Sequence, residues 1–234
     1  IAETSHLKGR HNQVATVQQA IYAAGRHVFI FGERGVGKTS LAKTAGLASV
    51  ENSKDFKQLG CSSETTFDSL MRQVIQTFAP EQLAKKSVKR GLGISKVVQA
   101  SRQREETYAA VEELSVPWVA DVLASLDDDG RKTVRVIVID EVDRVISEDA
   151  RRDFAELVKL LGDRGATITF IFTGVGTDIQ AILGHHPSSF RQFAQIELHR
   201  MELQPALDIV DDALSLFQLD WEREPTRTAR FRIA

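Results

Sequence analysis

Apolar residues along the chain follow two alternating patterns, short continuous runs and stripes with helical spacing. The runs predict strands over residues 28–31, 57–61, 134–139, 167–173 and 196–198. The stripes and helix-forming composition predict helices over residues 11–24, 40–45, 67–78, 119–126, 149–161, 179–183 and 206–217. Gly162 and Gly165 predict a loop after the helix at 149–161. Strands that alternate with helices indicate a parallel sheet, and therefore an α/β fold.

The composition indicates a water-soluble chain with enough apolar residues for one large core. It has 234 residues, 42% of them hydrophobic, and a net charge of −2 at pH 7, which favours neither nucleic acid nor an acidic membrane. No apolar stretch reaches the about 18–20 residues of a membrane span. The single cysteine, Cys61, excludes an internal disulfide and fits a reducing compartment. We therefore expect a cytoplasmic protein without membrane contact, and the opening Ile1 suggests a piece of a longer chain.

One segment has the sequence of a phosphate-binding loop. It reads Gly32-Glu33-Arg34-Gly35-Val36-Gly37-Lys38-Thr39, matches the pattern G-x-x-x-x-G-K-[ST], and is followed by Ser40. The loop joins a predicted strand to a predicted helix, as this chemistry requires. Glycines let backbone N–H groups turn around an anion, and the helix N-terminus adds partial positive charge. These residues are candidates for binding a nucleoside triphosphate, with Lys38 at the β- and γ-phosphates and the Thr39 hydroxyl on Mg²⁺.

Two carboxylates follow the predicted strand at 134–139. They are Asp140 and Glu141, about a hundred residues after the loop. The C-terminal end of a buried parallel strand points at the ligand crevice of an open α/β sheet. Asp140 can hold the hydration shell of Mg²⁺, and Glu141 can polarise the water that attacks the γ-phosphate. The sequence therefore predicts hydrolysis as well as binding.

Two further residues could complete this site. Thr173 ends the next predicted strand, where it either orients the attacking water or is an ordinary strand-end threonine. Arg191 precedes the last predicted strand, where it either reaches the γ-phosphate of a neighbouring subunit or is a surface arginine. The residues themselves leave both alternatives open.

Taken in order, these motifs resemble the AAA+ ATPases, and within them the branch of origin-recognition initiators and transposition regulators. The match runs from about Gly9 to Leu207. Gly9-Arg10 followed by a helix looks like the opening of that branch, and residues 139–145 look like its Walker B motif. By this resemblance, Thr173 takes the sensor-1 position and Arg191 lies in the segment that carries the arginine finger.

The resemblance implies a fold, cofactors and an arrangement of domains. The fold would be a three-layer α/β/α P-loop NTPase with a parallel sheet of order 5-1-4-3-2, and the cofactors ATP or ADP with Mg²⁺. Leu7, Gly9 and Arg10 would border the adenine. Residues 1–204 would form the nucleotide-binding domain and residues 205–234 the start of a truncated helical lid.

The chain also departs from the pattern of this family. Many initiators have asparagine where this sequence has Thr173. The second sensor arginine has three candidates, Arg223, Arg227 and Arg230, and none lies in a recognisable motif.

A basic segment interrupts the pattern of core elements. Seven basic residues and no acid lie between Glu81 and Glu105, so residues 80–115 are interpreted as an insertion. The part from Lys85 to Arg104 could bind DNA through its phosphates, dock an acidic effector protein, or be a solvated surface. These alternatives stay open at the level of sequence.

Two functions fit these features. The first is an AAA+ ATPase that forms homo-oligomers with shared ATP sites and couples its nucleotide state to assembly and to action on DNA or an effector. The alternative is a signalling switch of the STAND type, in which ATP and ADP exchange gates a fused sensor or effector domain.

Overall fold

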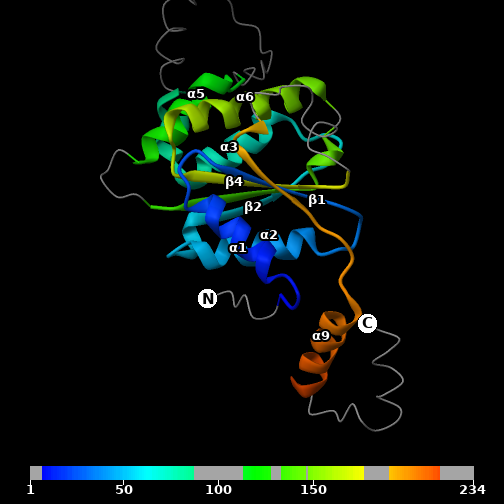
Figure 1. Ribbon diagram of the computed structural model, residues 1–234. Helices are drawn as coiled ribbons and strands as arrows, with labels where there is room; N and C mark the ends of the chain where they lie inside the picture. The colour runs from blue at the N-terminus through cyan, green and yellow to red at the C-terminus, as the bar shows by residue number, and fades with distance from the viewer. Residues whose placement is uncertain (1–6, 87–112, 128–132, 146, 177–189, 217–234) are drawn as a thin grey trace, which may run out of the picture.

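A five-stranded parallel sheet lies between two layers of helices (Figure 1). The computed structural model describes residues 7–86, 113–127, 133–145, 147–176 and 190–216. The strands are β1 (His27–Phe31), β2 (Phe56–Gly60), β3 (Arg135–Asp140), β4 (Ile168–Gly174) and β5 (Phe193–Glu197). Their order is β2-β3-β4-β1-β5, with parallel pairing throughout. This confirms the predicted sheet.

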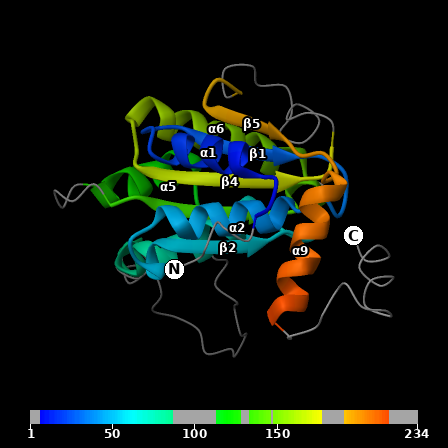
Figure 2. The same cartoon turned by 60° about the horizontal axis from the view of Figure 1, so that its bottom comes forward.

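Helices cover both faces of the sheet. On one face lie α1 (His11–Ile21) and α2 (Lys38–Ser49), and on the other α3 (Phe67–Phe78), α5 (Val116–Ala124) and α6 (Glu148–Arg164) (Figures 1 and 2). The three-layer prediction is therefore confirmed. One more helix, α9 (Leu203–Leu216), follows β5 and lies at the edge toward which the strands point (Figure 2).

The central strands are buried on both faces, which explains their continuous apolar runs. Successive side chains of a strand point to opposite faces. In β1, Val28 and Ile30 therefore join the core under α1 and α2, and Phe29 and Phe31 join the core under α3, α5 and α6. The second core is rich in aromatic rings: Phe154 of α6 meets Phe172 of β4 edge-on, with ring centroids 5.9 Å apart.

Three elements begin three residues earlier than the sequence predicted. β5 starts at Phe193 rather than at residue 196, because Phe193 is buried and pairs with His27. α5 starts at Val116 rather than 119, and α9 at Leu203 rather than 206. In both helices a proline lies in the first turn, where the missing N–H costs no intrahelical hydrogen bond. The predicted boundary between residues 204 and 205 consequently falls inside α9.

Several helices end elsewhere than predicted. α1 ends at Ile21 instead of residue 24. The loop predicted at Gly162–Gly165 is wrong, because α6 continues to Arg164 and ends at the left-handed Gly165. Gly162 serves a close contact instead: a Cβ there would lie 2.5 Å from the side-chain Cδ of Gln192. A glycine inside the helix thus lets the segment before β5 pack directly on α6.

Several predicted features lie outside the described residues. They are the helix at 179–183, the sensor-2 candidates Arg223, Arg227 and Arg230, and residues 87–112 of the basic insertion. The ends of that insertion are attached to the core. Residues 80–86 are helical, with Lys86 Nζ 4.6 Å from the ring centroid of Trp118. In the described part of the chain, no helix is long and apolar enough to cross a membrane.

One buried side chain makes the fold sensitive to acid. His27 has no exposed surface, and its Nδ1 accepts a hydrogen bond from the Phe170 N–H at 3.0 Å. Burial lowers the pKa of His27 from 6.5 to about 3. Between these values the unfolded chain binds a proton that the folded chain does not. Stability therefore falls as pH drops through this window, by up to roughly 1.4 kcal/mol per pH unit.

We expect the variant His27→Asn to lose less stability than the wild type between pH 6.5 and pH 4. The asparagine oxygen can still accept the Phe170 N–H, but no imidazole is left to titrate. Urea unfolding at a series of pH values measures the difference, with His11→Asn, a change at an exposed histidine, as the control. Equal losses of stability in wild type and His27→Asn would show that folding does not lower the pKa of His27.

Candidate nucleotide site

The phosphate-binding loop connects the end of β1 to the start of α2. Gly35 and Gly37 have positive φ angles of 84° and 95°, and Gly37 caps α2, which begins at Lys38. The first N–H groups of a helix have no intrahelical partner and form a ready site for an anion. The loop thus aims these donors into the space above the sheet.

The first glycine of the loop lies directly against the segment that follows β5. Gly32 has a φ of 141°, and a Cβ on it would lie 2.2 Å from the carbonyl oxygen of Leu198. The Leu198 N–H donates to the Phe31 carbonyl at 2.7 Å, which holds the two backbones together. The path of the loop therefore depends on the segment that leaves β5.

The ammonium of Lys38 lies over the mouth of the loop. Its Nζ donates to the carbonyl oxygens of Gly32 at 3.1 Å and Glu33 at 2.6 Å. Partial burial lowers the pKa of Lys38, although the carboxylates of Asp143, Asp140 and Glu141 act in the opposite direction. A cation with three donors is thus held where the phosphate chain of a nucleotide would pass.

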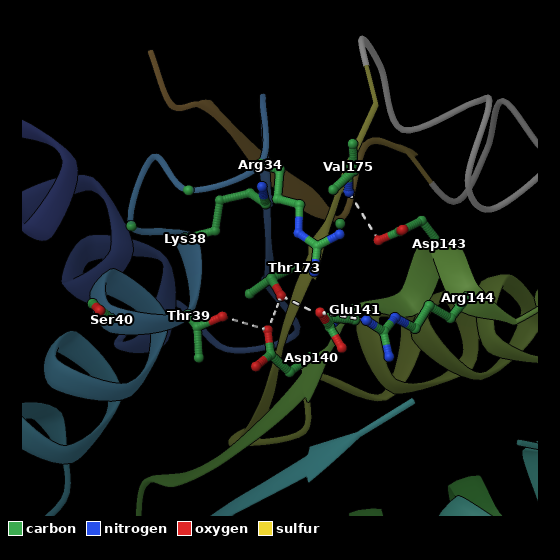
Figure 3. Close-up of a pocket in the computed structure, with 13 residues that line it drawn as sticks. Arg34, Lys38, Thr39, Ser40, Asp140, Glu141, Asp143, Arg144, Thr173 and Val175 are labelled. Atoms are coloured by element: carbon green, nitrogen blue, oxygen red, sulfur yellow. Dashed lines mark hydrogen bonds and ion pairs between the residues drawn. The ribbon is translucent and has the colours of Figure 1, made fainter. Parts of the chain in front are cut away.

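Asp140 joins the loop helix to the neighbouring strands (Figure 3). Its Oδ1 accepts hydrogen bonds from the hydroxyl of Thr39, at 2.9 Å, and from the hydroxyl of Thr173. Its Oδ2 accepts from Gln58 Nε2 at 3.4 Å. The structure thus brings together Thr39 and Asp140, the two predicted Mg²⁺ residues, from positions 101 apart in the chain.

Glu141 occupies a left-handed turn at the end of β3. Its φ is 58°, a conformation that costs a residue with a Cβ about 1–3 kcal/mol and is concentrated at functional sites. The carboxylate forms an ion pair with Arg144, with Oε1 and Nη2 3.2 Å apart, and both side chains are about half exposed. The turn thereby presents Glu141 beside Asp140 in the same cavity (Figure 3).

Thr173 links the two acids. It is 1% exposed, and its hydroxyl donates to Asp140 while accepting the Glu141 N–H at 3.2 Å. The single hydroxyl proton is therefore directed at Asp140 in this arrangement. Thr173 thus connects the carboxylate of Asp140 to the backbone of Glu141; its action on an attacking water stays a prediction.

The site includes two residues that the sequence did not single out. Asp143 accepts the Val175 N–H at 2.8 Å, which ties the turn after β3 to the segment after β4, and Arg144 pairs with Glu141. Both line the cavity. Both residues lie within the motif at 139–145, which was the one indication in the sequence that they belong to the site. The spacing of residues does not show which side chains of a turn face a cavity.

Two adjoining cavities lie above the carboxyl ends of the strands. The smaller, of about 310 Å³, is bounded by the phosphate loop and by the ends of β3 and β4. The larger, of about 570 Å³, is lined by loop residues and by Leu7, Arg10, Arg200, Met201, Ala206 and Ile209. Leu7 and Arg10 were expected there; the other four were missed because they come from the segment around α9, which only the fold places beside the loop.

Arg191 lies away from both cavities. It precedes Phe193, which pairs with His27 at the amino ends of β5 and β1, whereas the cavities lie at the carboxyl ends. Its side chain is exposed, and its backbone carbonyl accepts a hydrogen bond from Arg26. Arg191 therefore does not contribute to the site of its own chain.

A family model for the AAA domain matches residues 22–183, more than half of the chain. This protein belongs to the AAA domain family. The matched part of the AAA domain contains the phosphate loop, both acids and Thr173. A comparison with curated proteins found no match.

Solved structures share the fold of this AAA domain at low sequence identity. The Walker-type ATPase PABY2304 of Pyrococcus abyssi has a TM-score of 0.58 and 15% identity, over 94% of this chain and 61% of that one. The Orc1 protein of Aeropyrum pernix in complex with DNA has a TM-score of 0.53 and 12% identity, over 89% of this chain and 50% of that one. AMPPCP-bound DnaA from Aquifex aeolicus has a TM-score of 0.51 and 16% identity, over 94% and 55%. The chain thus spans only half to about three fifths of the length of these proteins.

Two glycines of the loop should respond differently to alanine. Gly32→Ala places a Cβ against the Leu198 carbonyl and should lower the free energy of unfolding by several kcal/mol. Gly35 has a positive φ of 84°, but nothing lies within 4 Å of the Cβ that Gly35→Ala would add, so only backbone strain of about 1–2 kcal/mol is expected. Urea unfolding without nucleotide measures both. Equal losses of unfolding free energy in the two variants would mean that the Leu198 carbonyl does not lie close to Gly32.

Proposed function

We propose that this AAA domain binds ATP with Mg²⁺ and hydrolyses it. The observation that carries the proposal is the contact of Thr39 with Asp140 at the mouth of the phosphate loop, with Glu141 next to it. The phosphate loop with the start of α2, and the end of β3, supply these groups, and together they provide phosphate donors, oxygen ligands and a base for water.

The residues fit a magnesium ion. Mg²⁺ prefers oxygen ligands and usually keeps several waters while it binds one or two protein groups and the phosphates of a substrate. The Thr39 hydroxyl would bind it directly and Asp140 would hold its waters. Within the described residues no group of three or more His, Cys, Asp or Glu side chains could hold a metal. The ion would neutralise charge on the β- and γ-phosphates.

The side chains of the two cavities suggest separate tasks. Lys38 and the N-terminus of α2 would neutralise the phosphates, and Glu141 would polarise the attacking water. Thr173 would hold both acids in place, and release of Glu141 from Arg144 would free it to act as a base. The larger cavity, which Leu7 and Met201 help to line, would receive the adenosine.

The position of Arg191 supports a site shared between subunits. It is exposed and lies at the amino edge of the sheet, so it is available to the carboxyl edge of a neighbouring copy. There its guanidinium would stabilise charge that develops on the γ-phosphate. The nucleotide state would then control assembly of a homo-oligomer.

The fold relatives suggest what such an assembly acts on. One was solved with AMPPCP and another with DNA. We therefore extend the proposal to action of the ATP-bound oligomer on DNA or on an effector protein, in line with the initiator-like branch of the family.

Two substitutions test hydrolysis. Lys38→Ala removes the cation from the loop and should weaken ATP binding at least about tenfold.

Glu141→Gln keeps the shape of the site but removes the base, so ATP should bind within a few-fold of wild type while turnover falls about 10²-fold or more. Fluorescent ATP titration and phosphate release measure the two effects, with Glu156→Gln, an exposed residue of α6, as the control. If Glu141→Gln hydrolysed ATP at the wild-type rate, Glu141 would not be the base.

A mixing experiment tests the shared site. Arg191→Ala retains its own loop and acids, and Lys38→Ala retains Arg191, so each variant alone should be nearly inactive. In a mixture, the loop of one subunit can meet Arg191 of another, and ATPase activity should reappear. Arg152→Ala on α6, an exposed arginine paired with Asp149, is the control and should keep full activity. Full activity of Arg191→Ala alone would exclude it from the mechanism.

A further inference from the structure

Arg10 connects two segments that are far apart in the chain. Its side chain is 7% exposed, and its Nη2 donates to the carbonyl oxygens of Val36, at 3.2 Å, and His199, at 2.6 Å. Val36 belongs to the phosphate loop, and His199 lies between β5 and α9. One buried guanidinium nitrogen thus donates both of its N–H groups to backbone carbonyls and holds these two segments together.

The burial of this charge is unusual, because among the described residues no carboxylate pairs with Arg10. A buried charge without a counter-ion is costly, and burial accordingly lowers the pKa of Arg10. The two carbonyl dipoles are its stabilising partners. The contact is therefore sensitive to geometry, since a shift of either carbonyl leaves a buried cation poorly solvated.

The residues around Arg10 extend this connection to α9. A Cβ on Gly9 would lie 2.8 Å from the ring of Pro205, and Lys8 forms an ion pair with Asp212 at 2.8 Å. Arg200, in the linker between β5 and α9, pairs with Glu33 of the phosphate loop at 2.9 Å. The segment at 7–10 therefore touches the loop, the linker after β5 and α9.

We propose that Arg10 is a positioning residue that couples the phosphate loop to α9, so that nucleotide binding in the loop sets the position of this helix. The proposal rests on ATP binding at the proposed site. Phosphates that bind the loop N–H groups reorient the adjoining peptides, and the carbonyl of Val36 turns with them. Arg10 transmits this change to His199 and to the linker, and by linkage the position of α9 alters nucleotide affinity by the same factor.

A purely structural role for Arg10 predicts something different. The guanidinium would then stabilise the fold equally with and without nucleotide, and its loss would leave the response of α9 to nucleotide unchanged. The exposed pair Lys8–Asp212 provides a comparison, because it joins the same segment to α9 but is weakened by solvent.

Hydrogen exchange of the α9 peptide, residues 203–216, separates these roles. Wild type, Arg10→Met, Arg10→Lys and Lys8→Met are compared with and without saturating AMPPCP and Mg²⁺, and nucleotide affinity is measured by titration. In wild type and Lys8→Met we expect nucleotide to slow exchange in α9. In Arg10→Met we expect nucleotide to bind about tenfold or more weakly, with no slowing of α9 exchange even at saturation. Arg10→Lys, which keeps a cation and its donors, should restore part of the response.

Two outcomes would overturn the coupling. One is equal slowing of α9 exchange in Arg10→Met and wild type at saturation. The other is wild-type protein that binds AMPPCP without any change in α9. Failure of wild type to bind AMPPCP would instead refute the proposed ATP site. If Arg10→Met does not fold, Arg10→Lys decides: a full wild-type response in affinity and exchange counts against a role for the forked guanidinium.

Discussion

Parallel pairing of β1, β3 and β4 is the constraint on which the site depends. Because all three strands run in one direction, their carboxyl ends meet at one edge of the sheet, with the phosphate loop, Asp140 and Thr173 side by side. The hydrogen bond from Thr39 to Asp140 closes this arrangement from α2. Apolar burial on both faces keeps the strands in place, so the chemistry of the edge is supported by two hydrophobic cores.

The polar groups at this edge of the sheet form a network of hydrogen bonds and ion pairs. Thr173 bonds both acids, Asp143 holds the segment after β4, and Arg144 pairs with Glu141. Such a network orients charge before a ligand arrives, which is the main requirement of phosphoryl transfer. The cost of a left-handed Glu141 is consistent with a residue placed for chemistry rather than for stability.

The sequence predicted the motifs well and the edges of elements less well. The loop and both acids follow from short-range patterns, since strand, glycine turn and helix are adjacent in the chain, whereas the sheet order was implied only by the resemblance to the AAA+ ATPases. Phe193 and Gly162 were misassigned because their roles are contacts with distant segments, His27 and Gln192. The starts of α5 and α9 were predicted too late because each helix has a proline in its first turn. Proline breaks a helix at interior positions but is tolerated in the first turn.

The sequence by itself identified the candidates for binding phosphate and magnesium, since Lys38, Thr39 and Asp140 lie in motifs whose chemistry is local. Only the tertiary structure decided what surrounds them. It placed α9 beside the loop, buried Arg10 between Val36 and His199, and put Arg191 at the opposite edge. These facts depend on contacts across as many as 189 residues. A pattern along the chain does not encode such contacts, because they arise from how the layers pack.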